Sequence, residues 1–394
     1  MSDSLLRRKP IIPERQDGHG LARTLNWPHL IALGVGAIVG TGILTLIGVG
    51  ADKAGPAVIL SFAIAGLICA CAALAYAEMA TMIPASGSAY TYSYVVIGEI
   101  IAWVVGWSLI LEYSLVVSAV AVGWSGYATG FLTSLGIPLP LAISAGPHAG
   151  GLLNVPAVLI VFAVAGLLAL GTKESATINA ILVVIKIVAL ILFVAVALPH
   201  YDANQFKPFM PFGFAAHPID GVQHGVMAAA AIIFFAFYGF DAISTAAEET
   251  KNPGRDLPIG IVGSMLVCTA LYVGVAAGAG GSMPYTVSAN SPEPPALILR
   301  TLGQSQIAAI IGAAAIIALP TVILAFLFGQ SRIFFVMARD GLLPANLARV
   351  SARTGTPIRM TMATALIVSI LAGLVPLDAI AALANAGTLA AFIA

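Results

Sequence analysis

The sequence predicts an all-α polytopic membrane protein, and three observations lead to this class. Hydrophobic residues make up 60% of the 394 positions, charged residues make up 9%, and the mean hydropathy is +1.01. A soluble domain carries roughly a quarter charged residues. The apolar positions gather in runs of about 20 residues, which is the length of a membrane-crossing helix. The 17 basic and 17 acidic residues balance, so the composition gives no basic surface for nucleic acid.

Ten apolar runs are long enough to cross a bilayer. They cover 28–50, 56–83, 100–131, 152–170, 176–199, 221–247, 258–280, 306–331, 358–376 and 378–394. Each is expected to be helical, because an open sheet would leave main-chain groups without hydrogen bonds in lipid. The chain stops inside the tenth run, so we expect C-terminal spans to be missing. The polar tail 1–27 contains no apolar run of the kind found in signal peptides.

The loops predict an orientation and a repeat. With a cytoplasmic tail, only the loop residues Lys53, Lys207 and Arg300 lie outside, as the positive-inside rule requires. We therefore expect the plasma (inner) membrane and a cytoplasmic N-terminus. Residues 28–199 and 221–394 form two predicted five-helix repeats, the second of them truncated after span ten. Five spans per half invert the second repeat, and inverted repeats are typical of transporters.

Glycines predict that spans one and six are broken. Span one contains GVGAIVGTGI (34–43), and span six contains FYGFD (237–241), in which a glycine stands close to a carboxylate. Glycine costs about 1 kcal/mol in a helix interior, and unwound backbone persists at membrane depth only where it lines a cavity. The freed amides attract a carboxylate and the freed carbonyls attract a cation. Close helix packing through GxxxG is an equally weighted alternative for span one.

Four separated motifs carry a resemblance to a known family. They are GAIVGTGI (36–43), PASGSAYTYSYVVIGE (84–99), FYGFDAISTAAEETKNPGRDLPIGI (237–261) and GQSRIFFVMARDGLLP (329–344). Together they resemble the cationic amino acid transporter (CAT) family of the amino acid–polyamine–organocation (APC) superfamily. The resemblance implies amino-acid permeation and the LeuT-type five-plus-five inverted repeat with broken spans one and six. Members usually carry further spans after the tenth.

The same resemblance implies how a substrate is bound. Its carboxylate is held by main-chain amides of the first break, which are those of Gly40, Thr41 and Gly42. Its ammonium group is held by main-chain carbonyls just before the breaks, which are those of Ile38, Phe235 and Tyr238. An amino acid is a zwitterion, so helix ends of opposite polarity complement it without a charged side chain.

Lys186 is the predicted proton-coupling residue. It lies near the middle of span five, where a lysine costs about 2.5–3.5 kcal/mol on insertion scales. That cost falls on the charged form, so protonation can be coupled to conformation. In proton-coupled relatives a lysine at this position takes the place of a sodium ion. The less favoured alternative is a snorkelling or salt-bridged structural lysine.

The remaining intramembrane acids have open roles. Glu112, in the middle of span three, contacts the substrate side chain or serves the proton path, or equally is a protonated carboxyl bonded to a neighbouring helix. Asp241 is a gate residue or, slightly favoured, a cap of the second half-helix. Glu248 and Glu249 are expected at a solvated span end, with a cytoplasmic gate to Arg332 as the less favoured alternative.

The sequence thus predicts a secondary amino-acid transporter, or permease, that works by alternating access and proton symport. An amino-acid exchanger and a non-transporting amino-acid sensor are the alternatives. Catalytic motifs and metal-ligand spacings are absent from the sequence, so no enzyme, metal or cofactor is expected, and H⁺ is the expected coupling ion. The expected partners are an amino acid and the lipid bilayer. The choice between cationic and small neutral substrates, and the oligomeric state, stay open.

Overall fold

The computed structural model describes residues 7–10, 22–44, 46–134, 136–289, 291, 293–351, 353–375 and 380, without the side chains of residues 41, 130, 134, 172–174 and 235. In chain order the α-helices are α1 (Trp27–Ile38), α2 (Thr41–Leu44), α3 (Leu46–Ala54), α4 (Val58–Met82), α5 (Ala89–Val96), α6 (Glu99–Ser134), α7 (Leu141–Ser144), α8 (Val155–Leu170), α9 (Thr172–Ala197), α10 (Val226–Ile233), α11 (Phe240–Ser244), α12 (Pro253–Ser282), α13 (Tyr285–Ser288), α14 (Pro294–Thr301), α15 (Ser305–Arg339) and α16 (Ile358–Leu374). Short 3₁₀ helices are η1 (Gly55–Ala57), η2 (Pro147–Ala149), η3 (Leu198–His200), η4 (Ala203–Phe206), η5 (Phe234–Phe237), η6 (Ala247–Glu249) and η7 (Ala345–Ala348).

Local sequence signals set several helix ends. Pro253 begins α12, where its missing N–H costs no helical hydrogen bond. Asn154 precedes α8 and accepts a hydrogen bond from the Ala157 amide at 3.2 Å, as an N-cap does. Gly171 separates α8 from α9 with φ +142°, a backbone conformation that favours glycine. The sequence therefore specifies these ends locally.

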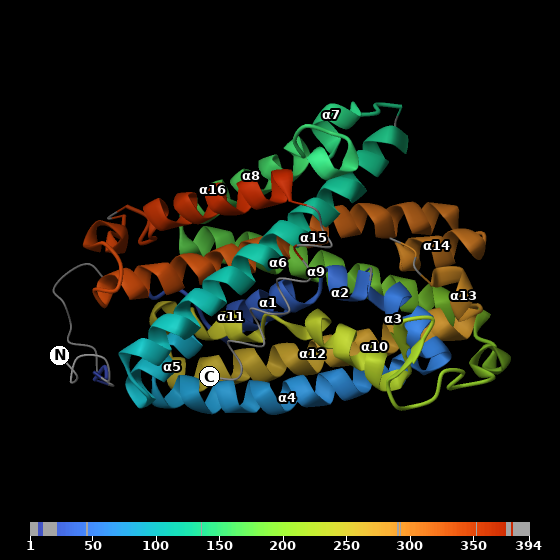
Figure 1. Cartoon of the computed structure of the whole chain (residues 1–394), viewed down its shortest axis with the longest axis horizontal. Coiled ribbons are helices and arrows are strands. Elements are labelled where there is room, and N and C mark those ends of the chain that lie inside the picture. Colours follow the sequence, from blue (N-terminus) through green and yellow to red (C-terminus); the bar gives the residue numbers. More distant parts are fainter. Residues whose placement is uncertain are drawn as a thin grey trace.

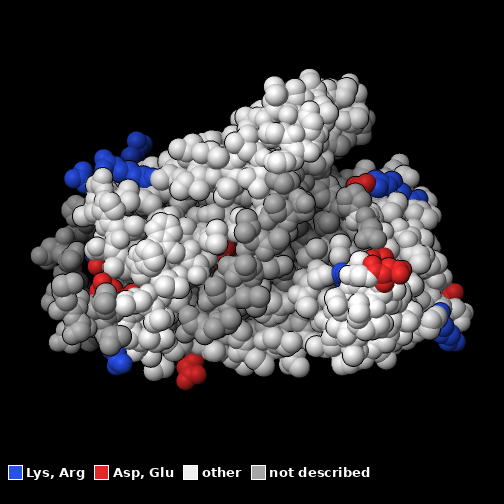
Figure 2. Space-filling view, in the orientation of Figure 1, with Lys and Arg blue, Asp and Glu red and all other residues white. Residues whose placement is uncertain are grey.

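Within the described residues, five helical segments are long and apolar enough to cross a membrane. They are Leu46–Met82, which joins α3 to α4 through η1, Glu99–Thr133, Ser175–His200, Pro253–Ser282 and Ser305–Arg339. α1, α8 and α16 are apolar but shorter. The predicted tenth span, 378–394, lies outside the described residues except for Ile380. Charged side chains gather toward the two ends of the visible face (Figure 2), and the chain fits a polytopic membrane protein.

The long helices run roughly along the long axis of an elongated bundle (Figure 1). α4 packs against α12, α6 against α15, and α8 against α16. α1 lies inside this frame, in contact with α9, α12 and α15, and most of its residues are buried. Segments from the first half of the chain therefore lie beside segments from the second half. This arrangement surrounds the end of α1 with other helices.

One small hairpin departs from the all-α prediction. β1 (His217–Ile219) and β2 (Val222–His224) are antiparallel, and their last and first residues lie opposite each other. The two-residue turn is Asp220–Gly221, with φ values of +49° and +80°. Positive φ at both positions is the requirement of a type I′ turn. Each strand has only three residues, so the fold stays helical.

Three of the ion pairs among the described residues lie at the end of the bundle to which the N-terminal tail is attached. We call this end the tail-side face. Arg332 of α15 donates to Glu249 of η6 at 2.8 and 3.3 Å, and both side chains are at most 1% exposed. The guanidinium also lies 3.7 Å from the centroid of the Phe328 ring. A solvated position for Glu249 was the favoured prediction, and the structure instead buries Glu249 against Arg332. The pair becomes visible only when η6 and α15 pack together.

The other two pairs complete the tail-side face. Arg339 donates two hydrogen bonds of 2.7 Å to Glu248, and Lys9 of the tail lies 2.7 Å from Asp340. Burial alone would raise the pKa of Glu248, but the hydrogen bonds and the charge of Arg339 outweigh burial and hold this pKa below its usual value. Glu248 is therefore ionised at neutral pH and keeps its partner.

We expect Glu249→Gln to lower the free energy of unfolding by about 3–5 kcal/mol, because Arg332 stays buried without its counter-charge. The matched control is Glu293→Gln, since the Glu293–Arg300 pair has side chains that are 35% and 45% exposed. Such a pair contributes at most about 1 kcal/mol. Unfolding of the detergent-purified protein measures both variants. Equal losses in the two variants would contradict the assignment.

Candidate functional site

The first helix of the bundle is interrupted near the middle of its predicted span. α1 ends at Ile38, Val39 has an extended ψ of 98°, and α2 begins at Thr41 after Gly40. The last carbonyls of α1 and the first amides of α2 have no partner within their own helices. The main-chain groups predicted to bind substrate at Ile38, Gly40, Thr41 and Gly42 therefore lie at an actual helix end.

A second interruption occurs in predicted span six. α10 ends at Ile233, η5 follows, and α11 begins at Phe240. Gly239 precedes α11 with φ +119°, a conformation that side chains other than glycine rarely adopt. Phe235 lies in η5, and Tyr238 lies in the turn between η5 and α11. The change of backbone geometry thus covers the two residues of span six whose carbonyls were predicted to bind an ammonium group.

The two interruptions touch each other through glycine. A Cβ on Gly42 would lie 2.6 Å from Cα of Ala236 and 3.1 Å from its carbonyl oxygen. A Cβ on Gly239 would lie 3.0 Å from the carbonyl carbon of Ala37. Real Cβ atoms essentially never come within 2.6 Å of a Cα, and contacts of 3.0–3.1 Å are tighter than nearly all real ones, so both positions strongly favour glycine. The glycines therefore serve close approach as well as unwinding.

Tyr272 of α12 links the two interruptions. Its hydroxyl lies 2.7 Å from the carbonyl oxygen of Ile38 and 3.1 Å from that of Ala236, and its ring is fully buried. A phenol has one proton to donate, so two carbonyls share one donor. Sequence reasoning missed Tyr272. The available signal was a hydroxyl in the middle of an apolar span.

Lys186 of α9 contacts the end of α1. Its Nζ donates to the carbonyls of Gly36 at 2.9 Å and Val39 at 2.7 Å, and to Oγ1 of Thr321 at 2.7 Å. The side chain is 2% exposed. The ammonium group therefore supplies hydrogen bonds and a positive charge to the negative end of a helix. Thr321 was also missed, although a polar residue directly after Pro320 inside an apolar span is a usable signal.

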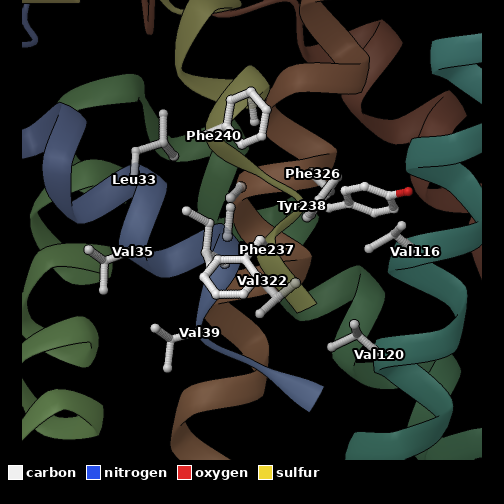
Figure 3. Packing of buried hydrophobic residues seen from close by; sticks show 14 of the residues in the cluster. Leu33, Val35, Val39, Val116, Val120, Phe237, Tyr238, Phe240, Val322 and Phe326 are labelled. Atoms are coloured by element: carbon white, nitrogen blue, oxygen red, sulfur yellow. The ribbon is translucent and has the colours of Figure 1, made fainter. Parts of the chain in front are cut away.

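A small cavity lies between the interruptions. It is lined by Ala37, Ile38, Gly40 and Gly42, by Val116 and Val120 of α6, by Ala236 and Tyr238, and by Val322 and Phe326 of α15. The volume of this cavity is about 20 Å³. Figure 3 shows the ring of Tyr238 directed toward Val116. The lining side chains are apolar except for the Tyr238 hydroxyl.

Glu112 and Asp241 do not line this cavity. Both are buried, at 2% and 3% exposed. Asp241 lies in the first turn of α11 and accepts a hydrogen bond from the hydroxyl of Tyr113. The Tyr113 ring in turn packs edge-on against Phe326, a cavity residue, at 5.0 Å between centroids. Asp241 is therefore connected to the cavity wall through Tyr113, the residue that follows Glu112.

Among the described residues, no three His, Cys, Asp or Glu side chains gather in a group that could hold a metal ion. The polar groups in or beside the cavity are main-chain carbonyls, the Lys186 ammonium and the hydroxyls of Tyr238, Tyr272 and Thr321. Such a set can bind a small zwitterion and can exchange a proton. It contains no arrangement of nucleophile and base.

Known proteins are similar in sequence to this chain over most of its length. A protein-family model described as amino acid permease matches residues 25–394. The branched-chain amino acid permease BcaP of Bacillus subtilis (strain 168) is 47% identical over 400 residues, which cover 100% of this chain and 84% of BcaP. The methylthioribose transporter of the same organism is 43% identical over 394 residues, covering 99% of this chain and 83% of that protein.

A plant relative extends the comparison. Cationic amino acid transporter 2, vacuolar, of Arabidopsis thaliana is 40% identical over 396 residues, which cover 99% of this chain and 61% of the plant protein. The predicted superfamily is thereby confirmed. The chain belongs to the amino acid permease family of the APC superfamily, a family of membrane transporters and not of enzymes.

Proposed function

We propose that this permease is a secondary active amino-acid transporter that binds the substrate backbone between the two interrupted helices and works by alternating access. The observation that carries the proposal is the contact between the two interruptions, whose helix ends line a cavity. The carboxylate would meet the amides of Gly40, Thr41 and Gly42, and the ammonium group the carbonyls of Ile38, Phe235 and Tyr238. The cavity is smaller than an amino acid, so the half-helices must separate for entry.

We propose further that the fold is a five-plus-five inverted repeat of the LeuT type, which would allow alternating access. Under this assignment residues 28–199 and 221–394 are the repeats, and α4, α6 and α8 correspond to α12, α15 and α16. Each of these helices packs against its proposed counterpart, and α1 packs against α11. Such pairing is expected when two repeats are related by a two-fold axis in the membrane plane. Rocking of one part against the other would then open each side in turn.

The substrate we propose is a neutral amino acid with an apolar, branched side chain. The cavity walls of Val116, Val120, Val322 and Phe326 are apolar, and a cationic side chain would lose its hydration there without an acidic partner. Glu112 lies outside the lining. BcaP, which is named for branched-chain amino acids, agrees with this choice. The cationic substrates in the plant relatives' names are therefore not proposed here.

We propose that a proton on Lys186 is the coupling ion. The protonated amine holds the carbonyls of Gly36 and Val39 at the end of α1. Loss of the proton removes the positive charge and one donor, which weakens the attachment of α1 to α9. A change in proton occupancy would thereby favour a different position of α1. Lys186 is thus assigned to coupling and not to substrate binding.

The tail-side face would be the cytoplasmic side of the plasma membrane. The distribution of Lys and Arg in the loops favours this orientation. The pairs Glu249–Arg332, Glu248–Arg339 and Lys9–Asp340 would then close the inner entrance. Opening toward the cytoplasm would have to break them, because they join the tail and η6 to the end of α15.

Ligand-induced stabilisation tests the substrate assignment. Leucine, isoleucine and valine should raise the unfolding temperature of the detergent-purified protein, because a ligand at one hundred times its Kd stabilises by about 2.7 kcal/mol. Leucinamide is the control, since it lacks the carboxylate that the first break would bind. A shift with arginine or lysine alone would disprove the apolar substrate. A shift with no amino acid would oppose both the permease and the sensor assignments.

Lys186→Gln tests proton coupling. Glutamine can donate to a carbonyl but carries no titratable proton, so leucine uptake driven by a pH gradient in proteoliposomes should be lost. Lys207→Gln is the control, because Lys207 is exposed in a loop. Counterflow measured without a pH gradient distinguishes a symporter from the rival exchanger. An exchanger would need amino acid inside the proteoliposomes, and its uptake would not depend on the pH gradient. Full gradient-driven uptake by Lys186→Gln would refute the role of this lysine.

Gly42→Ala tests the contact between the interruptions. The new Cβ would press on Cα of Ala236, and overpacking costs about 1–3 kcal/mol. We expect leucine affinity to fall about tenfold or more. Gly126→Ala is the control, because nothing lies within 4 Å of a Cβ at that exposed helical position. Unchanged affinity in Gly42→Ala would show that the contact is not part of the site.

A further inference from the structure

A second cavity lies beside the N-terminal half of α1, nearer to the tail-side face than Lys186 is. It is lined by Leu25, His29 and Leu33, by Ser175, Ala176 and Asn179 of α9, and by Leu324 and Phe328 of α15. The volume of this cavity is about 10 Å³, which is close to the lower limit for one water molecule. Its walls are mainly apolar, but Ser175, His29 and Asn179 bring polar atoms to it. The cavity can therefore hold a water molecule.

The amide of Asn179 has a defined orientation. Its Nδ2 donates to the carbonyl of Ala32 at 3.1 Å, so the other amide atom is the acceptor Oδ1. The side chain is 1% exposed, and Oδ1 is buried without a hydrogen-bond partner. A buried acceptor without a partner costs about 1–3 kcal/mol. A water molecule bound at Oδ1 would remove that cost.

Asn179 and Lys186 reach the same residue of α1. They are seven residues, or about two turns, apart on α9, so they lie on one face of the helix. A Cβ on Gly36 would lie 2.9 Å from Oδ1 of Asn179, and Nζ of Lys186 donates to the Gly36 carbonyl at 2.9 Å. Both the lysine and the amide therefore lie against Gly36. Cys268 of α12 also lies near Lys186, and His29 lines the cavity.

We propose that this cavity is the inner half of the proton path and that a water molecule on Asn179 receives the proton that Lys186 releases. One Nζ–H group would first turn from its present acceptor to this water. Its N–H bond then breaks with the electron pair left on nitrogen and a new O–H bond forms on the water, while the water passes one of its own protons to the imidazole of His29, which lines the same cavity. The inference rests on the proposed coupling role of Lys186 and adds the route by which the proton leaves. Asn179 is thus a positioning residue for water and does not touch substrate.

Asn179→Leu is the variant that tests this route, because leucine has a similar volume and no acceptor. Leucine uptake driven by a pH gradient should fall about tenfold, as expected when one hydrogen-bonding position for water is lost. Counterflow at equal pH should stay within about twofold of wild type, because exchange needs no proton release. Asn179→Ser keeps an oxygen and leaves room for water, so it should retain most of the driven uptake. Leu324→Val is the control for a change in cavity shape alone.

The outcomes separate this inference from the proposed function. Gradient-driven uptake that is lost in Lys186→Gln but normal in Asn179→Leu would overturn the proton route alone. Equal losses of driven uptake and counterflow in Asn179→Leu would also overturn it, since they would assign Asn179 a purely structural role. A loss of gradient-driven uptake in Asn179→Ser as large as that in Asn179→Leu would also overturn the proton route. Wild-type uptake that ignores the pH gradient would remove the coupling proposal itself.

Discussion

Main-chain polar groups inside a bilayer need partners, and the structure depends on how this need is met where α1 stops. At Val39 and Gly40 the helix gives up its regular hydrogen bonds, and no bulk water replaces them at that depth. An ammonium group from α9 and a phenol from α12 supply donors instead. The interruption is therefore stable only because these helices pack around it. Glycine at Gly42 allows the second interruption to come close enough to share the Tyr272 hydroxyl.

The same solution explains how a site without acidic side chains can suit a zwitterion. Two carbonyls share the single hydroxyl proton of Tyr272, so one acceptor is available to a substrate ammonium group. The surrounding side chains are apolar, which strengthens every remaining electrostatic interaction. Charge is thus kept in the main chain and in Lys186. Under the proposed function, the walls of the cavity would select the substrate side chain by shape.

Coupling between the site and the tail-side face follows from the position of α1. Its last turn is held by Lys186, its middle contacts Asn179, and residues just before its first turn bond to η6. η6 in turn carries Glu249, which is buried against Arg332 of α15. A shift of α1 would therefore be felt at the cavity and at the ion pairs together. Rigid packing transmits such a shift, because buried helices have few intermediate arrangements.

Hydrophobicity and glycine content are local properties, so the sequence alone determined the class of membrane protein, the family, the five segments long enough to cross a membrane and the two places where a helix stops. The sequence also singled out Lys186, because a lysine inside an apolar run is costly anywhere. Its partners were not visible, since Gly36 is 150 residues away and Thr321 is 135 residues away. Burial of Glu249, the link through Tyr272 and the free acceptor of Asn179 were likewise decided by tertiary structure. These features depend on which helix faces meet, and that is fixed by packing between segments distant in the chain.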